Sequence, residues 1–139
     1  MTANALTEGA LDCHRLPTIL LVEDEILTRM AMSEQLRDDG YSVLEAANAD
    51  EALVVLHGPT RVDVVVTDMR MPGAADGGTL ARWVRAKLPF VKVIMVSGQR
   101  PAPDVRILLD GFLPKPVEPS HLASYVQTLA QAQPTPEIG

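Results

Sequence analysis

The stretch from Val62 to Pro72 constrains the fold more than any other part of the chain. Four of the five residues from Val62 to Val66 are valine, and β-branched side chains favour a pleated strand that is buried on both faces. The strand ends at a carboxylate, Asp68, after which Pro72 and Gly73 interrupt the regular backbone. Open α/β sheets bind ligands beyond the carboxyl ends of their strands. Asp68 is therefore either a functional residue or a single solvated loop carboxylate.

The rest of the chain alternates between apolar runs and segments with helical periodicity. We predict strands at residues 18–22, 41–45, 62–68, 91–96 and 111–113, with helices between them and after the last one. Ile26, Met30, Ser33 and Leu36 share one face of the first helix, which predicts its buried side. This order predicts an α/β fold, a doubly wound parallel sheet with right-handed crossovers.

Size and charge limit the function classes that remain. A chain of 139 residues and 15.0 kDa has the size of one domain, which we place at residues 17–132, with flexible ends at 1–16 and 133–139. No apolar run approaches the ~20 residues that cross a bilayer, and no secretory signal precedes the first strand, so we expect no membrane insertion and a cytoplasmic location. A net charge of −6 disfavours direct binding to nucleic acid, and a protein partner is expected.

Polar residues follow most of the predicted strands. Glu23 and Asp24 end the first strand, Asp68 the third, Ser97 the fourth, and Lys115 follows the fifth. Acids near a helix start can be simple caps, and an isolated Asp carries little information. In a parallel sheet, however, these strand ends converge on one edge, where two acids, a third acid, a hydroxyl and an amine form one chemical set.

This set is similar to that of the receiver (REC) domains of two-component response regulators, which have a flavodoxin-like (βα)5 fold with strand order 2-1-3-4-5. The similarity covers residues 18–131 and depends on four motifs. These are Leu21-Val22-Glu23-Asp24-Glu25, Thr67-Asp68-Met69-Arg70-Met71-Pro72 with Asp76-Gly77, Ser97-Gly98, and Phe112-Leu113-Pro114-Lys115-Pro116. Because no output module follows, a stand-alone, single-domain receiver is expected.

The resemblance implies a role for each residue at this edge. Asp68 is expected to accept a phosphoryl group from a sensor histidine kinase or a phosphotransfer protein, while Lys115 and Ser97 contact phosphoryl oxygens. A carboxylate and a phosphoryl donor are both anionic, so a divalent cation must screen their repulsion. Mg²⁺, or Mn²⁺ in its place, would be bound by Glu23, Asp24, Asp68 and the main-chain carbonyl of Arg70. The modified domain would then bind a target protein or pass the group to a histidine phosphotransfer protein.

The resemblance also implies a switch. Ser97 would move toward the phosphoryl group and Phe112 would turn inward, although Phe112 can equally be a core residue. The resemblance further implies a cis peptide bond at Lys115-Pro116. Arg70 and Gln99, each two residues beyond a site residue, match positions that tune the lifetime of the acyl phosphate.

The chain departs from the family pattern between Ser97 and Lys115. These 18 positions (115 − 97) are about one helical turn fewer than is usual in the family, and Pro101 and Pro103 lie among them. We expect a shortened or irregular fourth helix, at most from 104 to 110, and partner recognition that depends more on the fifth helix.

Two other classes remain as alternatives. Phosphatases that use an aspartate nucleophile also place it after a buried strand, but they resemble one another in a second Asp two positions on, where this chain has Arg70. An interaction domain that keeps only the fold would not need all the site residues. We therefore expect a phosphoacceptor that catalyses only its own phosphorylation and dephosphorylation, not an enzyme that turns over a substrate.

Overall fold

The computed structural model describes residues 16–71, 73 and 76–131, the last without its side chain. The predicted leader, except Leu16, and the predicted tail lie outside the described residues, as does Pro72. The elements are β1 (Thr18–Val22), α2 (Ile26–Asp38), β2 (Ser42–Ala46), α3 (Ala49–His57), β3 (Val64–Asp68), α4 (Gly77–Lys87), β4 (Lys92–Ser97), α5 (Pro103–Arg106), β5 (Gly111–Pro114) and α6 (Pro119–Gln131). None of the helices described is long and apolar enough to cross a membrane.

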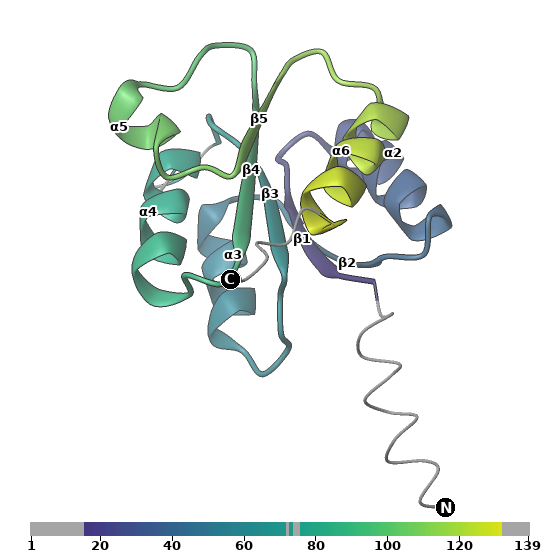
Figure 1. Ribbon diagram of the computed structural model, residues 1–139, viewed down its shortest axis with the longest axis horizontal. Helices are drawn as coiled ribbons and strands as arrows, with labels where there is room; N and C mark the ends of the chain where they lie inside the picture. Colours follow the sequence, from purple (N-terminus) through teal and green to yellow (C-terminus); the bar gives the residue numbers. More distant parts are fainter. Residues whose placement is uncertain (1–15, 72, 74–75, 132–139) are drawn as a thin grey trace, which may run out of the picture.

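The strands form one parallel sheet in the order β2-β1-β3-β4-β5, which confirms the predicted flavodoxin-like topology (Figure 1). Every residue of β1 and β3 is buried, as their continuous apolar runs predict. Successive side chains of a strand point to opposite faces of the sheet. Thus Ile19 and Leu21 belong to one apolar cluster, and Leu20 and Val22 belong to the other.

Helices cover both faces of the sheet (Figure 1). Helices α2 and α6 pack on one face through Met32, Leu36, Leu122 and Val126. Helices α3 and α4 pack on the other face, and α5 lies beside α4. Because helices cover both faces of the sheet, the polar residues that end the inner strands can reach solvent at the carboxyl edge of the sheet.

The predicted buried face of the first helix is partly wrong. In α2, Ser33 and Leu36 are buried together with Met32, but Ile26 and Met30 are 61% and 50% exposed. The buried residues of α2 all lie from Met32 onward, so the N-terminal part of the helix contributes little to the core. Elsewhere, boundaries shift by a few residues: the second and fourth strands each begin and end one residue later than predicted, and the third begins at Val64.

The segment between β4 and β5 contains a helix of only four residues, α5, so the expected shortening of the fourth helix is confirmed. Its bounds are Pro103–Arg106 and not 104–110: Pro103 suits the first turn of a helix, and residues 107–110 form the turn that leads to β5. The Lys115-Pro116 bond is cis, as predicted.

Candidate functional site

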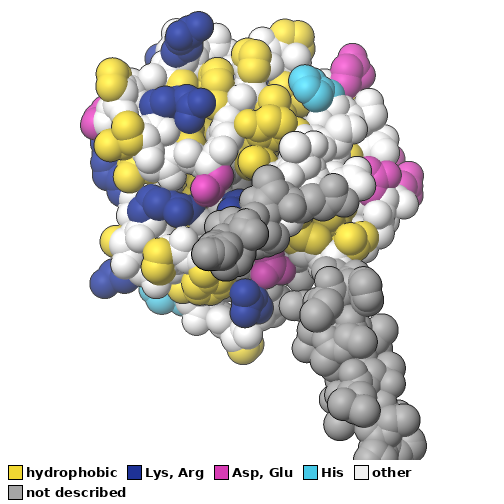
Figure 2. All heavy atoms as spheres, viewed as in Figure 1, with side chains coloured by type: hydrophobic (Ala, Val, Ile, Leu, Met, Phe, Trp, Pro, Cys, Tyr) yellow, Lys and Arg dark blue, Asp and Glu magenta, His cyan; other side chains and the backbone are white. Residues whose placement is uncertain are grey.

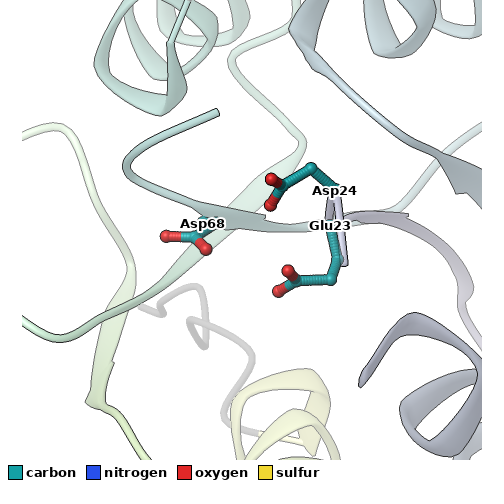
Figure 3. Close-up of side chains that lie close together, drawn as sticks. All are labelled: Glu23, Asp24 and Asp68. Atoms are coloured by element: carbon teal, nitrogen blue, oxygen red, sulfur yellow. The ribbon is translucent and has the colours of Figure 1, made fainter. Parts of the chain in front are cut away.

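Three carboxylates meet at the carboxyl ends of β1 and β3, where Figure 3 shows Glu23, Asp24 and Asp68 grouped together. One oxygen of each lies within 4.8 Å of the others. Glu23 and Asp68 are buried, with 4% and 8% of their surfaces exposed, whereas Asp24 is exposed. The predicted convergence of the first and third strands on one acidic site is therefore present in the structure.

Lys115 reaches this cluster from the loop after β5. Its Nζ lies 2.5 Å from Oδ2 of Asp68 and 3.8 Å from Oε1 of Glu23. Partial burial lowers the pKa of Lys115, but the hydrogen bond to Asp68 and the charges of Glu23, Asp68 and Asp24 outweigh it, so the pKa is raised above the usual 10.5. Lys115 therefore stays protonated at physiological pH.

Glu23 is held in place by the backbone around it. Its N–H donates to the carbonyl of Ala46, and its Oε2 accepts a hydrogen bond of 3.1 Å from the N–H of Glu25. Burial raises the pKa of Glu23, aided by the charges of Asp68 and Asp24 and opposed by the Glu25 N–H and by Lys115. The positive charge of Lys115 therefore compensates only part of the negative charge of the three carboxylates.

This shortage of positive charge indicates that the acid cluster can accommodate a divalent cation. One lysine faces three carboxylates, and all three offer oxygen ligands, which Mg²⁺ and Mn²⁺ prefer. Glu23, Asp24 and Asp68 therefore fit a divalent cation.

The backbone after β3 adds a contact to Asp68. The N–H of Arg70 donates to Oδ1 of Asp68 at 3.3 Å, while Lys115 occupies Oδ2. Each carboxylate oxygen of Asp68 therefore has a donor. The Arg70 backbone lies beside the cluster, and the use of its carbonyl as a metal ligand stays a prediction.

Ser97 ends β4 one position beyond Val96, the residue paired with Asp68. It is 4% exposed, and its Oγ accepts a hydrogen bond from the N–H of Gln99 at 3.1 Å. The carbonyl of Ser97 accepts a hydrogen bond from the N–H of Lys115 at 2.9 Å. Ser97 and Lys115 are thus tied to each other through the backbone.

The two predicted lifetime-tuning residues contact each other. Nη2 of Arg70 donates to Oε1 of Gln99 at 3.1 Å, and both residues are exposed. This hydrogen bond joins the loops after β3 and β4 beside Asp68 and Ser97.

Phe112, the predicted switch residue, lies on β5 opposite Met95. It is half-buried, and it lines a cleft together with Ser97. Ser97 and Phe112 are therefore neighbours across one cleft, and their movement stays a prediction.

Two residues that support the site were missed as such from the sequence. Arg29 of α2 donates from Nη1 to the carbonyl of Glu23 at 2.7 Å and forms an ion pair with Glu45. Gly77 begins α4 so close to β3 that a Cβ there would lie 2.2 Å from the carbonyl oxygen of Asp68. The Asp76-Gly77 motif pointed to Gly77 without this reason, and Arg29 had no sequence signal because its contact is tertiary.

Fold and site together define a phosphoacceptor-type α/β domain, with an acid cluster and a lysine at the carboxyl edge of a 2-1-3-4-5 sheet. The model for the response regulator receiver domain matches residues 19–127. The chain therefore belongs to the family of response regulator receiver domains.

Curated relatives place similar domains inside longer proteins. The chain is 40% identical over 131 residues to the sensor kinase CckA of Brucella abortus, covering 91% of this chain and 14% of that protein. It is 33% identical over 108 residues to the response regulator receiver protein Anae109_2439 of Anaeromyxobacter sp., covering 78% of this chain and 43% of that one. The chain thus spans less than half the length of each.

Two solved structures of receiver proteins share the fold, and each aligns with about four fifths of this chain. The receiver domain of the hybrid histidine kinase CckA is 36% identical with a TM-score of 0.68, covering 81% of this chain and 97% of that one. The response regulator TrrA of Thermotoga maritima, in complex with Mg²⁺ and BeF, is 28% identical with a TM-score of 0.73, covering 82% of this chain and 99% of that one.

Proposed function

We propose that this receiver accepts a phosphoryl group on Asp68 and changes its protein–protein interactions in response. The observation that supports this most directly is the placement of Asp68, buried between the acid pair and Lys115 at the edge of the sheet. A single lysine beside three carboxylates suits a site that binds a cation and then an anionic phosphoryl group.

The chemistry is nucleophilic substitution at phosphorus. A carboxylate oxygen of Asp68 forms a bond to phosphorus as the bond to the donor's leaving group breaks, and the leaving group takes the electron pair. Bound Mg²⁺ or Mn²⁺ would neutralise negative charge on the phosphoryl oxygens, and Glu23, Asp24, Asp68 and the Arg70 carbonyl are its proposed ligands.

The chain's other site residues orient the group. The Lys115 ammonium, held 2.5 Å from Asp68, is placed to pair with a phosphoryl oxygen. The hydroxyl of Ser97 accepts a hydrogen bond from Gln99 and still has its own proton to donate. That donor is the contact through which Ser97 and then Phe112 would respond to phosphorylation.

The partner, location and domain bounds are part of the same proposal. A sensor histidine kinase is the proposed donor, because CckA is itself a sensor kinase that contains a stretch similar to this chain. A phosphotransfer protein or a target protein would then bind the modified domain. We propose that residues 17–132 form this domain and that it acts in the cytoplasm.

Arg70 disfavours the alternative that the protein is a phosphatase. The position two residues beyond Asp68 has a guanidinium that donates to Gln99, and a guanidinium does not release its proton, so it cannot act as the general acid. We therefore propose a phosphoacceptor without turnover of an external substrate. A fold kept only for interaction is disfavoured as well, since the Asp68, Lys115 and acid-pair contacts are all present.

The test is phosphorylation by a small acyl-phosphate donor. Incubation of the protein with acetyl phosphate and Mg²⁺ should add one phosphoryl group that is lost in acid and in base, as detected by intact-mass analysis. Asp68→Asn should abolish the addition, because the amide is not a nucleophile. Asp38→Asn, which removes an exposed carboxylate near the end of α2, is the matched control and should be labelled like the wild type.

Three results would contradict the proposal. Persistent labelling of Asp68→Asn would show that another residue is the nucleophile. Equal labelling in the presence of EDTA would show that the reaction does not need a metal ion. Continuous release of phosphate from several phosphate esters would favour the phosphatase class.

A further inference from the structure

Hydrogen bonds fix the short connection between β1 and α2 that contains the acid pair, Glu23 and Asp24. The N–H of Glu23 donates to the carbonyl of Ala46 at 3.0 Å, and the N–H of Glu25 donates to Oε2 of Glu23 at 3.1 Å. Arg29 adds a third contact, a hydrogen bond of 2.7 Å from its Nη1 to the carbonyl of Glu23. This carbonyl belongs to the peptide group that joins Glu23 to Asp24, so Arg29 contacts the backbone from which both carboxylates extend.

Arg29 has a second partner that fixes its own side chain. Its Nε donates to Oε1 of Glu45, on the edge strand β2, at 3.1 Å. A guanidinium is planar and its donors point in fixed directions, so one arginine can bond to a carboxylate and to a main-chain carbonyl at the same time. Figure 2 shows many Lys and Arg side chains at the surface, on the left of the view over α4, α5 and β5. In contrast to such surface cations, the side chain of Arg29 is only 18% exposed, and its guanidinium is held by protein groups.

The charge of Arg29 and its hydrogen bond to Glu23 have opposite expected effects on a bound cation. A positive charge near the acid cluster repels a second cation, so its loss by itself would strengthen cation binding. Loss of the hydrogen bond would free the peptide group between Glu23 and Asp24 and weaken binding, because both carboxylates would have to be ordered when the cation binds. Among the described residues, Lys115 forms the ion pairs with the cluster, whereas Arg29 pairs with Glu45. We therefore expect the hydrogen bond to dominate.

We propose that Arg29 is a positioning residue of the cation site. It holds the peptide group between Glu23 and Asp24 so that both side chains point toward Asp68, as Figure 3 shows. The inference rests on the proposed function, because it assumes that these carboxylates bind Mg²⁺ or Mn²⁺. Residues that orient metal ligands without contacting the metal typically change metal affinity by about 10- to 100-fold when they are replaced. The affinity for a divalent cation should therefore depend on Arg29, although Arg29 is not a ligand.

The test is a titration of the full chain with Mn²⁺, in which electron paramagnetic resonance measures the Mn²⁺ that stays free. Arg29→Gln should raise the dissociation constant by about tenfold. Arg29→Lys keeps the charge but has no planar set of donors, so it should also bind Mn²⁺ more weakly than the wild type. In the acetyl phosphate assay, Arg29→Gln should need about ten times more Mg²⁺ to reach half of its maximal labelling rate.

The matched control is Arg37→Gln, on the same helix. The guanidinium of Arg37 pairs with Oε2 of Glu45 at 3.1 Å and donates to the carbonyl of Val43 at 2.9 Å. This variant therefore removes the same charge and an ion pair with Glu45, but it keeps the hydrogen bond from Arg29 to Glu23. It should bind Mn²⁺ like the wild type. Thermal melting of the metal-free proteins checks that each variant folds, and Arg29→Lys decides the question if Arg29→Gln does not fold.

The inference is wrong if Arg29→Gln binds Mn²⁺ as tightly as the wild type, or more tightly, as the loss of charge alone would require. Equal weakening in Arg29→Gln and Arg37→Gln would also contradict it, because both variants lose an ion pair with Glu45 and only one loses the contact to Glu23. Wild-type affinity in Arg29→Lys would show that a guanidinium is not needed and would overturn the inference too. Absence of Mn²⁺ binding by the wild type would instead reject the cation site of the proposed function, and this inference with it.

Discussion

Substitution of Gly77 by alanine tests how closely the site depends on the contact between α4 and β3. A Cβ at this position would lie 2.2 Å from the carbonyl oxygen of Asp68 and 3.0 Å from its carbonyl carbon. Both atoms are backbone, so no side chain can rotate away. Since real Cβ contacts essentially never fall below 3.0 Å, the helix start and the end of β3 must separate by at least 0.8 Å (3.0 − 2.2).

That separation sets the expected size of the effect. Overpacking of a tight contact costs about 1–3 kcal/mol, and each kcal/mol lowers the melting temperature of a domain of this size by roughly 3–5 °C. The end of β3 that must move contains Asp68, the proposed phosphoacceptor. A misplacement near 1 Å can slow a positioned reaction by about a hundredfold, so phosphorylation of Gly77→Ala should fall far more than its stability.

The assay compares Gly77→Ala with Gly78→Ala, which adds the same methyl group one residue along α4. At Gly78 the nearest atoms to a Cβ are 3.4 Å away, in the side chains of Asp76 and Val105, which is ordinary contact. Gly78→Ala should therefore keep its melting temperature and its labelling by acetyl phosphate. If Gly77→Ala matches Gly78→Ala in both measurements, the close approach does not position Asp68 and the reasoning fails.

Three further predictions concern the charges around the site. Glu23→Gln should raise the free energy of unfolding of the metal-free protein at pH 7 by about 1 kcal/mol in urea denaturation, because it removes a buried charge beside two others; a loss would contradict this. Lys115→Gln should lower it by about 1 kcal/mol, a value reduced for the 34% exposure of the side chain, and Mg²⁺ should restore part of the loss. Arg37 and Arg29 outweigh the effect of burial and hold the pKa of Glu45 below 4.5, so Glu45→Gln should destabilise the protein at pH 7. The difference in stability from the wild type should vanish as the pH falls through that lowered pKa. Thermal melts of both proteins at pH 7 and pH 3 would measure this difference.

The parts of the fold that the sequence predicted are those decided by burial on two faces. A parallel strand inside a doubly wound sheet has no solvent side, so its apolar run is continuous and polar residues mark its carboxyl end. Asp68 and Ser97 are such ends, and the sheet topology places them on neighbouring strands. The register of a parallel sheet therefore made the location of the site predictable before any side-chain contact was known.

The parts that were missed depend on contacts between elements. Ile26 and Met30 have the helical spacing of a buried stripe, but periodicity does not specify which part of a helix packs on the core. Arg29 is an ordinary helix residue until its guanidinium meets the carbonyl of Glu23. The cleft that Ser97 and Phe112 line depends on the path of the loop after β4, which the prolines at 101 and 103 did not specify.

The electrostatics of the acid cluster connect stability to function. Without a cation, Glu23 and Asp68 are buried beside Asp24 with one lysine to balance them, and burial raises the pKa of Glu23. A ligand that binds only the folded state adds stability in proportion to the logarithm of its concentration, about 2.7 kcal/mol at a hundred times its dissociation constant. The carboxylates that repel one another in the metal-free protein are thus the same groups through which a bound cation would stabilise the fold. A mutation that relieves this repulsion would also remove the stabilisation that the cation provides. Fold stability and phosphoacceptor chemistry at this edge are therefore expected to change in opposite directions when Glu23 is neutralised.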